Sequence, residues 1–265
     1  MKHVGAIAGR ELRSMFVSPV AYVVLTLFAV MGGFFFLASV LSFDANVGQA
    51  QQFQAFDYLR DLNLNDFLIA PFLQVMWIVL LFLIPGVTMG LFANEKINGT
   101  QELLLTSPIT IWELVLGKYL AAAAFVAILV LMLGLFCGIL FIYGEPEPAK
   151  TLAGLLGMLL VGLTYAAVGT FASSLTRNQL IAFFLALVLL LILWLLSVFA
   201  DLGAAGGAMG ASSGVSEVLR WLSSSEHFDQ LVRGLIDTRA LAHFGFMIGV
   251  FLLLTKASVE SVRWR

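Results

Sequence analysis

Few residues of this chain have the types and spacing that chemistry needs, and the clearest such pattern is Gly210-Ala-Ser-Ser-Gly214, which formally reads Gly-x-Ser-x-Gly. In serine hydrolases this pattern forms a strained strand-to-helix elbow beside a base. In this chain it lies in a Gly/Ala/Ser-rich run, residues 203–214, with no strand pattern before it. His227 and His243 are available as bases, but no orienting carboxylate is evident. A serine hydrolase within the membrane, acting through Ser212, is therefore a minor alternative.

Phosphate and metal chemistry have no motif in the sequence either. A nucleotide-binding loop would read Gly-x-x-x-x-Gly-Lys-Ser/Thr, whereas Gly117-Lys118 is followed by Tyr119 and lacks the upstream glycine. Without that cradle of backbone N–H groups, ATP hydrolysis would have to occur on another polypeptide. The single cysteine, Cys137, excludes an intrachain disulfide and a cysteine-based zinc site. We expect no catalytic residue, no metal and no cofactor in this chain.

The most informative polar residues lie in the segment 94–118, between two apolar stretches. Gly99 permits a sharp turn, and Thr100 can cap a short helix that continues to Leu105. Pro108 ends this helix because proline lacks the N–H donor and clashes with the preceding turn. The spacing predicts a short, leucine-rich helix lying across the ends of two longer ones.

A second helix start follows directly. Thr110 and Glu113 have the spacing of a capping box, which predicts that the next helix begins near Ile111. The short helix before it is rimmed by Glu95 and Glu102. Held between two long helices, such an element can move both as a lever, and we treat residues 94–113 as a coupling loop.

Composition places the chain in a membrane. Of its 265 residues, 61% are hydrophobic and 11% charged, with a mean hydropathy of +1.01, whereas a soluble domain is about half apolar and a quarter charged. The balance of 14 basic and 16 acidic residues lacks the basic face that nucleic-acid binding needs. A helix needs about 20 apolar residues to cross the bilayer. Six stretches are long enough: 17–41, 67–92, 114–143, 152–175, 180–200 and 241–256.

Ionisable side chains are nearly absent from these six stretches. Lys118 lies in the first turns of the third and Lys256 at the end of the sixth, where long side chains can reach the headgroups. We therefore expect no buried ionisable residue that marks an ion path. Small residues favour close packing of helices in lipid, and we expect such packing at Gly134, Gly138, Gly162, Ala166 and Gly169.

Positive residues beside short loops predict the orientation, because they are retained on the cytoplasmic side. They gather at both chain ends and in the loops after the second and fourth stretches: Lys2, Arg10, Arg13, Lys96, Lys118, Arg177, Lys256, Arg263 and Arg265. The loops 42–66 and 144–150 are acidic by contrast. We expect a multi-pass protein of the cell (inner) membrane with both termini in the cytoplasm.

Two segments outside the spans are amphipathic. Apolar residues recur at helical spacing within residues 1–16, which predicts a helix lying in the cytoplasmic interface. Residues 201–240 are expected outside the cell, with one or two amphipathic helices after the glycine-rich run. His227, Arg233 and Asp237 are candidates for an outer gate. An i, i+4 ion pair between Arg233 and Asp237 on a surface helix would explain two of them without any function.

The chain resembles the permeases of the ABC-2 transporter superfamily, and more closely their gliding-motility-associated GldF-type branch. The loop signature lies between the second and third spans, and a second patch precedes the last span. The residues that carry the resemblance are Glu95, Gly99-Thr100, Glu102-Leu-Leu-Leu105, Ser107-Pro108 and Glu113-Leu-Val-Leu-Gly-Lys118, together with His227-Phe228 and Arg233-Gly-Leu-Ile-Asp237.

The resemblance implies an all-α membrane protein whose residues 1–265 form one permease domain without catalysis of its own. The short transverse helix would be a coupling helix that docks on a cytoplasmic ABC ATPase, and that ATPase would bind ATP and magnesium. Two permeases, identical or similar, would pair, with an extracellular auxiliary membrane protein as a further partner. The coupling residues would be Glu95, Gly99, Thr100, Glu102, Leu103, Leu104, Pro108, Glu113 and Lys118.

A carrier or channel that works without an ATPase is the other alternative. Such proteins show charged or broken helices at mid-membrane depth. Pro71 and Pro85 in the second span are the only such signs in the sequence, and membrane helices tolerate proline. We favour a permease that uses ATP hydrolysis on a partner to export a substrate or to transmit force across the membrane.

Overall fold

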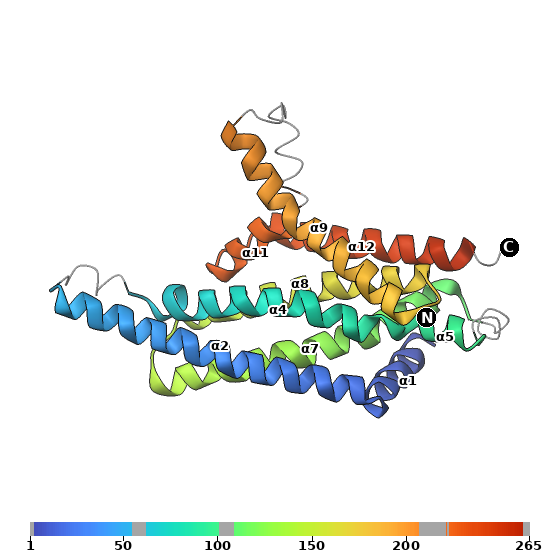
Figure 1. Ribbon diagram of the computed structural model, residues 1–265, viewed down its shortest axis with the longest axis horizontal. Coiled ribbons are helices and arrows are strands. Elements are labelled where there is room, and N and C mark those ends of the chain that lie inside the picture. Colours follow the sequence, from blue (N-terminus) through green and yellow to red (C-terminus); the bar gives the residue numbers. More distant parts are fainter. Residues whose placement is uncertain (1–2, 55–61, 101–108, 207–220, 222, 262–265) are drawn as a thin grey trace.

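The computed structural model describes residues 3–54, 62–100, 109–206, 221 and 223–261, with side chains except at 197–206. Every regular element in these ranges is a helix (Figure 1). The elements are α1 (Val4–Val17), α2 (Pro19–Gln52), η1 (Asn65–Ile69), α4 (Ala70–Thr88), α5 (Gly90–Ile97), α7 (Ile111–Tyr143), α8 (Pro148–Leu175), α9 (Gln179–Gly206), α11 (Ser224–Val232) and α12 (Thr238–Ser261).

Within the described ranges, six helical segments are long and apolar enough to cross a membrane, which confirms the predicted number. They are Pro19–Gln52, Asn65–Ile97, Ile111–Tyr143, Pro148–Leu175, Gln179–Leu196 and Thr238–Ser261. In Figure 1 the long helices share one general direction, and α1, α5 and the start of α7 lie at the same end as the end of α12. We call this the coupling end. α9 continues to Gly206, beyond the expected end of the fifth span at Ala200 and into the glycine-rich run.

Sequence signals set most helix starts. Ser18 separates α1 from α2, and its hydroxyl accepts a hydrogen bond from the N–H of Val20 at 3.3 Å. Pro19 occupies the first turn of α2, where its missing N–H costs nothing. Pro148 does the same for α8. The chain therefore turns sharply between α1, the predicted interfacial helix, and the first span.

The second span is not one continuous helix, contrary to the expectation for residues 67–92. It consists of a π-helical turn, η1, then α4 and α5, with an interruption at Met89. Pro85 lies inside α4 and cannot donate the backbone hydrogen bond of a regular helix. The interruption follows within one turn, so α5 can take its own direction.

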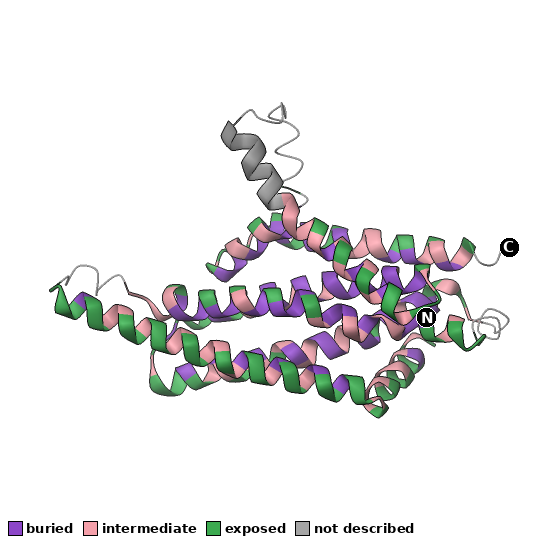
Figure 2. Ribbon diagram, viewed as in Figure 1, coloured by how far each residue is buried: buried purple, intermediate pink, exposed green. Residues whose placement is uncertain are grey.

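α8 lies at the centre of the packing. Figure 2 shows buried residues along α4, α7 and α8, whereas α2 is mostly exposed. Glycines bring α8 close to its neighbours: a methyl group on Gly162 would lie 2.5 Å from the Val126 side chain, and one on Gly169 would lie 2.0 Å from Thr88 Oγ1. The packing roles predicted for these two glycines are confirmed. The role predicted for Gly138 is wrong, since no described atom lies within 4 Å of its methyl position.

Candidate functional site

A buried lysine lies at the coupling end. Lys118, in the second turn of α7, is 1% exposed, and its Nζ lies 2.7 Å from a carboxylate oxygen of Glu95 and 3.2 Å from one of Glu11. It also donates to the Leu91 carbonyl at 2.5 Å and lies 5.2 Å from the centre of the Phe92 ring. The expectation that Lys118 extends to the headgroups is wrong, because its side chain is enclosed within the protein.

Arg10 completes a group of four charges, which we call the coupling cluster: Arg10, Glu11, Glu95 and Lys118. The Arg10 guanidinium lies 2.7 Å from Glu11 and 3.7 Å from Glu95. Two positive and two negative side chains from α1, α5 and α7 therefore meet at one point. Buried ion pairs add little net stability, but losing one partner costs about 3–5 kcal/mol because a charge is left unpaired. The cluster thus specifies how the three helices sit together.

Helical spacing and one glycine position the cluster. Gly117 precedes the buried lysine, and a methyl group on it would lie 2.7 Å from the Ile7 side chain, so α1 crosses α7 in close contact. Val4, Ile7 and Glu11 have the i, i+3, i+7 spacing of one helix face. Sequence reasoning missed Arg10 and Glu11 as site residues. Glu11 lies on the same helix face as the apolar residues Val4 and Ile7, and a carboxylate on that face was the signal that could have identified it.

The loop after α5 begins with a helix-terminating turn. Gly99 has φ of +69°, and the N–H of Thr100 donates to the Glu95 carbonyl at 3.0 Å, which is the glycine-based end expected of a helix. The Thr100 hydroxyl donates to the same carbonyl at 3.4 Å. The sharp turn predicted at Gly99 is confirmed. Glu95 lies inside the coupling cluster, 13% exposed, rather than on an outer rim.

The predicted contact residues Glu102, Leu103, Leu104 and Pro108 lie outside the described residues. The start of α7 beyond them follows the prediction: Thr110 accepts from the N–H of Glu113 and donates its own N–H to the Glu113 carboxylate, both at 3.3 Å. The capping box is confirmed, and α7 begins at Ile111. The segment 101–108 is therefore flanked by a terminated helix on one side and a capped helix on the other.

Across residues 5–259 the chain matches the family described as ABC-2 family transporter protein. The chain belongs to the ABC-2 transporter family. A search of curated proteins finds no match. With six helices able to span a bilayer, this multi-pass membrane protein is a permease subunit of an ABC transporter.

The interruption in the second span is stabilised from α8 of the permease. Ser173 accepts hydrogen bonds from the N–H groups of Phe92 and Ala93 at 3.0 and 3.2 Å and donates to the Met89 carbonyl at 2.8 Å. Lys96 donates to the Ser174 carbonyl. One serine thus replaces the backbone bonds lost at the break, so α5 is attached to α8 by polar contacts beside the coupling cluster.

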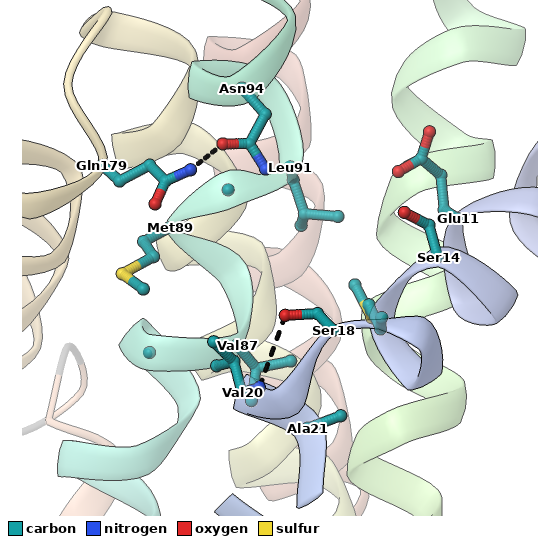
Figure 3. A pocket seen from close by; sticks show the side chains of 13 residues that line it. Glu11, Ser14, Ser18, Val20, Ala21, Val87, Met89, Leu91, Asn94 and Gln179 are labelled. Carbon is teal, nitrogen blue, oxygen red and sulfur yellow. Dashed lines mark hydrogen bonds between the residues drawn. The ribbon is translucent and has the colours of Figure 1, made fainter. Parts of the chain in front are cut away.

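A cavity of about 150 Å³ lies beside this break (Figure 3). Figure 3 shows that it is bordered by the α1–α2 turn, by α4 and α5, and by the start of α9, where Gln179 donates to Asn94. Glu11 of the coupling cluster and Gly86 are among its lining residues. No described atom lies within 4 Å of a methyl group placed on Gly86. The space gives α5 room to move relative to α1.

The candidates for an outer gate lie on and after α11, away from the coupling end (Figure 1). His227 is buried between helices, with 8% of its surface exposed. Arg233 pairs with Asp229 at 2.9 Å, not with Asp237. The expected Arg233–Asp237 pair is wrong because α11 ends at Val232 and Gly234, with φ of +85°, turns the chain. Asp237 instead accepts from the N–H of Arg239 at the start of α12.

The predicted amphipathic helix of this region is α11. Its apolar side packs on α8, where Phe228 and Leu231 approach Gly157. Phe228 also stacks on Trp77 with ring centres 5.0 Å apart. α11 is therefore part of the packed bundle rather than a loosely attached surface helix. Ser212, the proposed nucleophile of a hydrolase, lies outside the described residues.

Proposed function

We propose that this permease couples ATP hydrolysis on a separate ABC ATPase to movement of its helices, through the loop between α5 and α7. The observation that carries the proposal is the coupling cluster, which binds α1, α5 and α7 together at the base of that loop. Force applied to the loop would reach α7 through Lys118 and α1 through Glu11. The loop would act as a lever because its two flanking helices share one buried ionic contact.

The break at Met89 would allow α5 to move with the loop independently of α4. α5 is separated from α4 by the interruption and is held by Ser173 and the coupling cluster. A tilt of α5 would therefore be transmitted to α7 and α1 without bending α4 as a whole. The cavity beside the break provides the space for this tilt.

The remaining assembly follows the sequence predictions. The ATPase would bind ATP and magnesium, and this chain would supply no catalytic residue. The distribution of Lys and Arg supports cytoplasmic termini in the inner membrane and a coupling end that faces the cytoplasm. A second permease, identical or similar, would complete the transporter, with an extracellular auxiliary protein beside it. The loop and Arg233–Asp237 signatures support the GldF-type branch, with export of amphipathic cargo or force transmission as its task.

A carrier that works without an ATPase is less well supported. Both prolines that suggested it have local structural roles, since Pro71 lies in the first turn of α4 and Pro85 precedes the break at Met89. The charged cluster lies at the coupling end between helices rather than along a path through the bundle. Family membership also favours an ATP-driven transporter.

The test is copurification of the ATPase with the tagged permease from native membranes. We expect Leu104→Glu to lower the amount of copurified ATPase at least about tenfold, because one buried leucine contributes about 1.5–3 kcal/mol and the new carboxylate would be unpaired in the contact. Expression and membrane insertion should not change. ATP hydrolysis by the purified complex is measured in parallel.

The matched control is Leu235→Glu, the same change at an exposed leucine after α11. It should copurify the ATPase like the parent chain. If Leu104→Glu also retains the ATPase and its hydrolysis at the parent level, the loop is not the coupling element and the proposal is wrong.

A further inference from the structure

The packing of α11 on α12 brings two imidazole rings into contact inside the protein. His227 of α11 and His243 of α12 stack with their centres 4.4 Å apart and their planes at 30°. His227 is 8% exposed, and His243 is fully buried. Trp221 covers the edge of the pair, 5.6 Å from the His243 ring. Two titratable rings from different helices thus form one closed contact.

His227 has no polar partner in this contact. Neither of its ring nitrogens has a hydrogen-bond partner among the described residues, and Nε2 of His243 lies 3.4 Å from Ser224 Oγ. An unsatisfied buried polar group costs about 1–3 kcal/mol, so native proteins seldom keep one without a use. Phenylalanine would fill the same space without this cost. The choice of histidine therefore needs a chemical reason.

Metal binding and catalysis do not supply that reason. The described residues contain no group of three His, Cys, Asp or Glu side chains able to hold a metal. Ser224 beside His243 is 4% exposed, so a substrate could not reach its hydroxyl. The remaining chemistry of an imidazole pair is proton binding.

Among the described side chains, no charged group is in position to stabilise a proton on the pair. Asp229 is held by Arg233 and by Gln74, and Glu226 points to solvent. α8, α9 and α12 pack on α11. Besides His243, the titratable or charged side chains described on these elements are Lys150 and Tyr165 on α8, and Arg239, Lys256 and Glu260 on α12, with Asp237 just before α12. The described side chains of α9 include none. Within the described part of the chain, His227 makes its one ring contact with His243 and takes part in no ion pair.

We propose that His227 and His243 form a proton-binding pair that controls whether α11 stays packed on α12. In the neutral state the two rings stack as apolar surfaces. One proton places a charge in a contact that no described carboxylate reaches, and two protons repel across 4.4 Å. α11 has only nine residues, too few to persist without its packing. Proton uptake therefore releases α11 from the bundle, which opens the end of the permease away from the coupling cluster.

Cysteine labelling of the purified chain in lipid nanodiscs tests this switch without any ATPase. Cys137 is first replaced by alanine. Leu231 is fully buried against α8, so the thiol of Leu231→Cys becomes reactive only when α11 is released. Gln230 is half-buried, and the thiol of Gln230→Cys reports how labelling itself depends on pH. The ratio of the two maleimide rates should rise about tenfold from pH about 7.5 to about 5.5, the range over which histidine changes charge.

His227→Phe and His243→Phe keep the stacked aromatic contact but each leaves one histidine, so each should reduce this rise while labelling like the parent at pH about 7.5. The double variant cannot take up a proton at this contact and should remove the rise. Circular dichroism checks that each variant keeps its helices. One variant that stays folded is enough to test whether the histidine pair causes the rise. A flat ratio in the parent overturns the proposal. An unchanged rise in a folded phenylalanine variant overturns it as well, because another group would then be responsible.

Discussion

The two ends of the bundle bury polar groups in opposite ways. At the coupling end a full positive charge, Lys118, is enclosed by two carboxylates and a backbone carbonyl. At the α11 end the buried polar groups include two stacked imidazole rings, and the Arg233–Asp229 ion pair lies at the surface. The first arrangement holds three helices in one geometry, whereas the second is held by contacts that one proton can weaken.

The glycines of α8 also differ between the two ends in how closely neighbouring helices approach them. Near the coupling end Gly169 lies so close to Thr88 that no methyl group fits. Near α11 the methyl position of Gly157 is 3.1 Å from Leu231 Cβ, which a small shift can accommodate. Of these two glycines of α8, the one near the coupling end therefore tolerates a methyl group less, although Gly154, whose methyl position is 2.7 Å from Leu73, shows that α8 is close-packed near α11 as well.

The largest expected effect is at the buried lysine. Lys118→Met should lower the free energy of unfolding of the purified permease by about 3–5 kcal/mol, because the largely buried Glu95 would lose its cation at 2.7 Å and keep only Arg10 at 3.7 Å. Unfolding in mixed micelles with increasing SDS measures it. Lys118→Met combined with Glu95→Gln should lose less than the two single changes added together, since the neutral amide removes the unpaired charge.

Lys150→Met is the matched control, a partly exposed cation near α11 that pairs with Glu147 at 3.2 Å and Asp66 at 3.7 Å. It should change the free energy of unfolding by less than about 1 kcal/mol. Equal losses at the two lysines would remove the distinction between the two ends.

A smaller effect is expected from the glycines of α8. Gly169→Ala should destabilise by about 1–3 kcal/mol, because Thr88 cannot rotate away without losing its 3.0 Å hydrogen bond to the Ile84 carbonyl. Gly157→Ala should destabilise less. Gly138→Ala meets no atom and should be neutral or stabilise by up to about 1 kcal/mol through helix propensity. The same SDS titration ranks the three variants, and a greater loss at Gly157 than at Gly169 would reverse our view of α8.

The smallest effect is expected at the surface ion pair near α11. Arg233→Ala should change the free energy of unfolding by less than about 1 kcal/mol and leave copurification of the ATPase intact, because the pair with Asp229 is exposed and screened by salt. A loss that persists in about 1 M salt would show that Arg233 makes a contact beyond this pair.

The sequence alone predicted what depends on neighbouring residues. The number of spanning helices follows from the length of apolar runs, the start of α7 from Thr110 and Glu113, and the turn at Gly99 from the conformational freedom of glycine. These features are set within one or two helical turns, so local rules suffice to find them. The ABC-2 resemblance likewise rested on short contiguous patches, the loop after the second span and residues 227–237, and the family match agrees with the superfamily.

Only the tertiary structure decided which residues meet across helices. Lys118 and Glu11 are 107 positions apart, and nothing in the sequence distinguishes a lysine that reaches the headgroups from one enclosed by two carboxylates. The stack of His227 on His243 depends in the same way on how α11 docks. Arg233 and Asp237 have helical spacing, yet Gly234 separates them. Burial and pairing depend on the packing of whole helices, because a side chain's surroundings are supplied by distant parts of the chain.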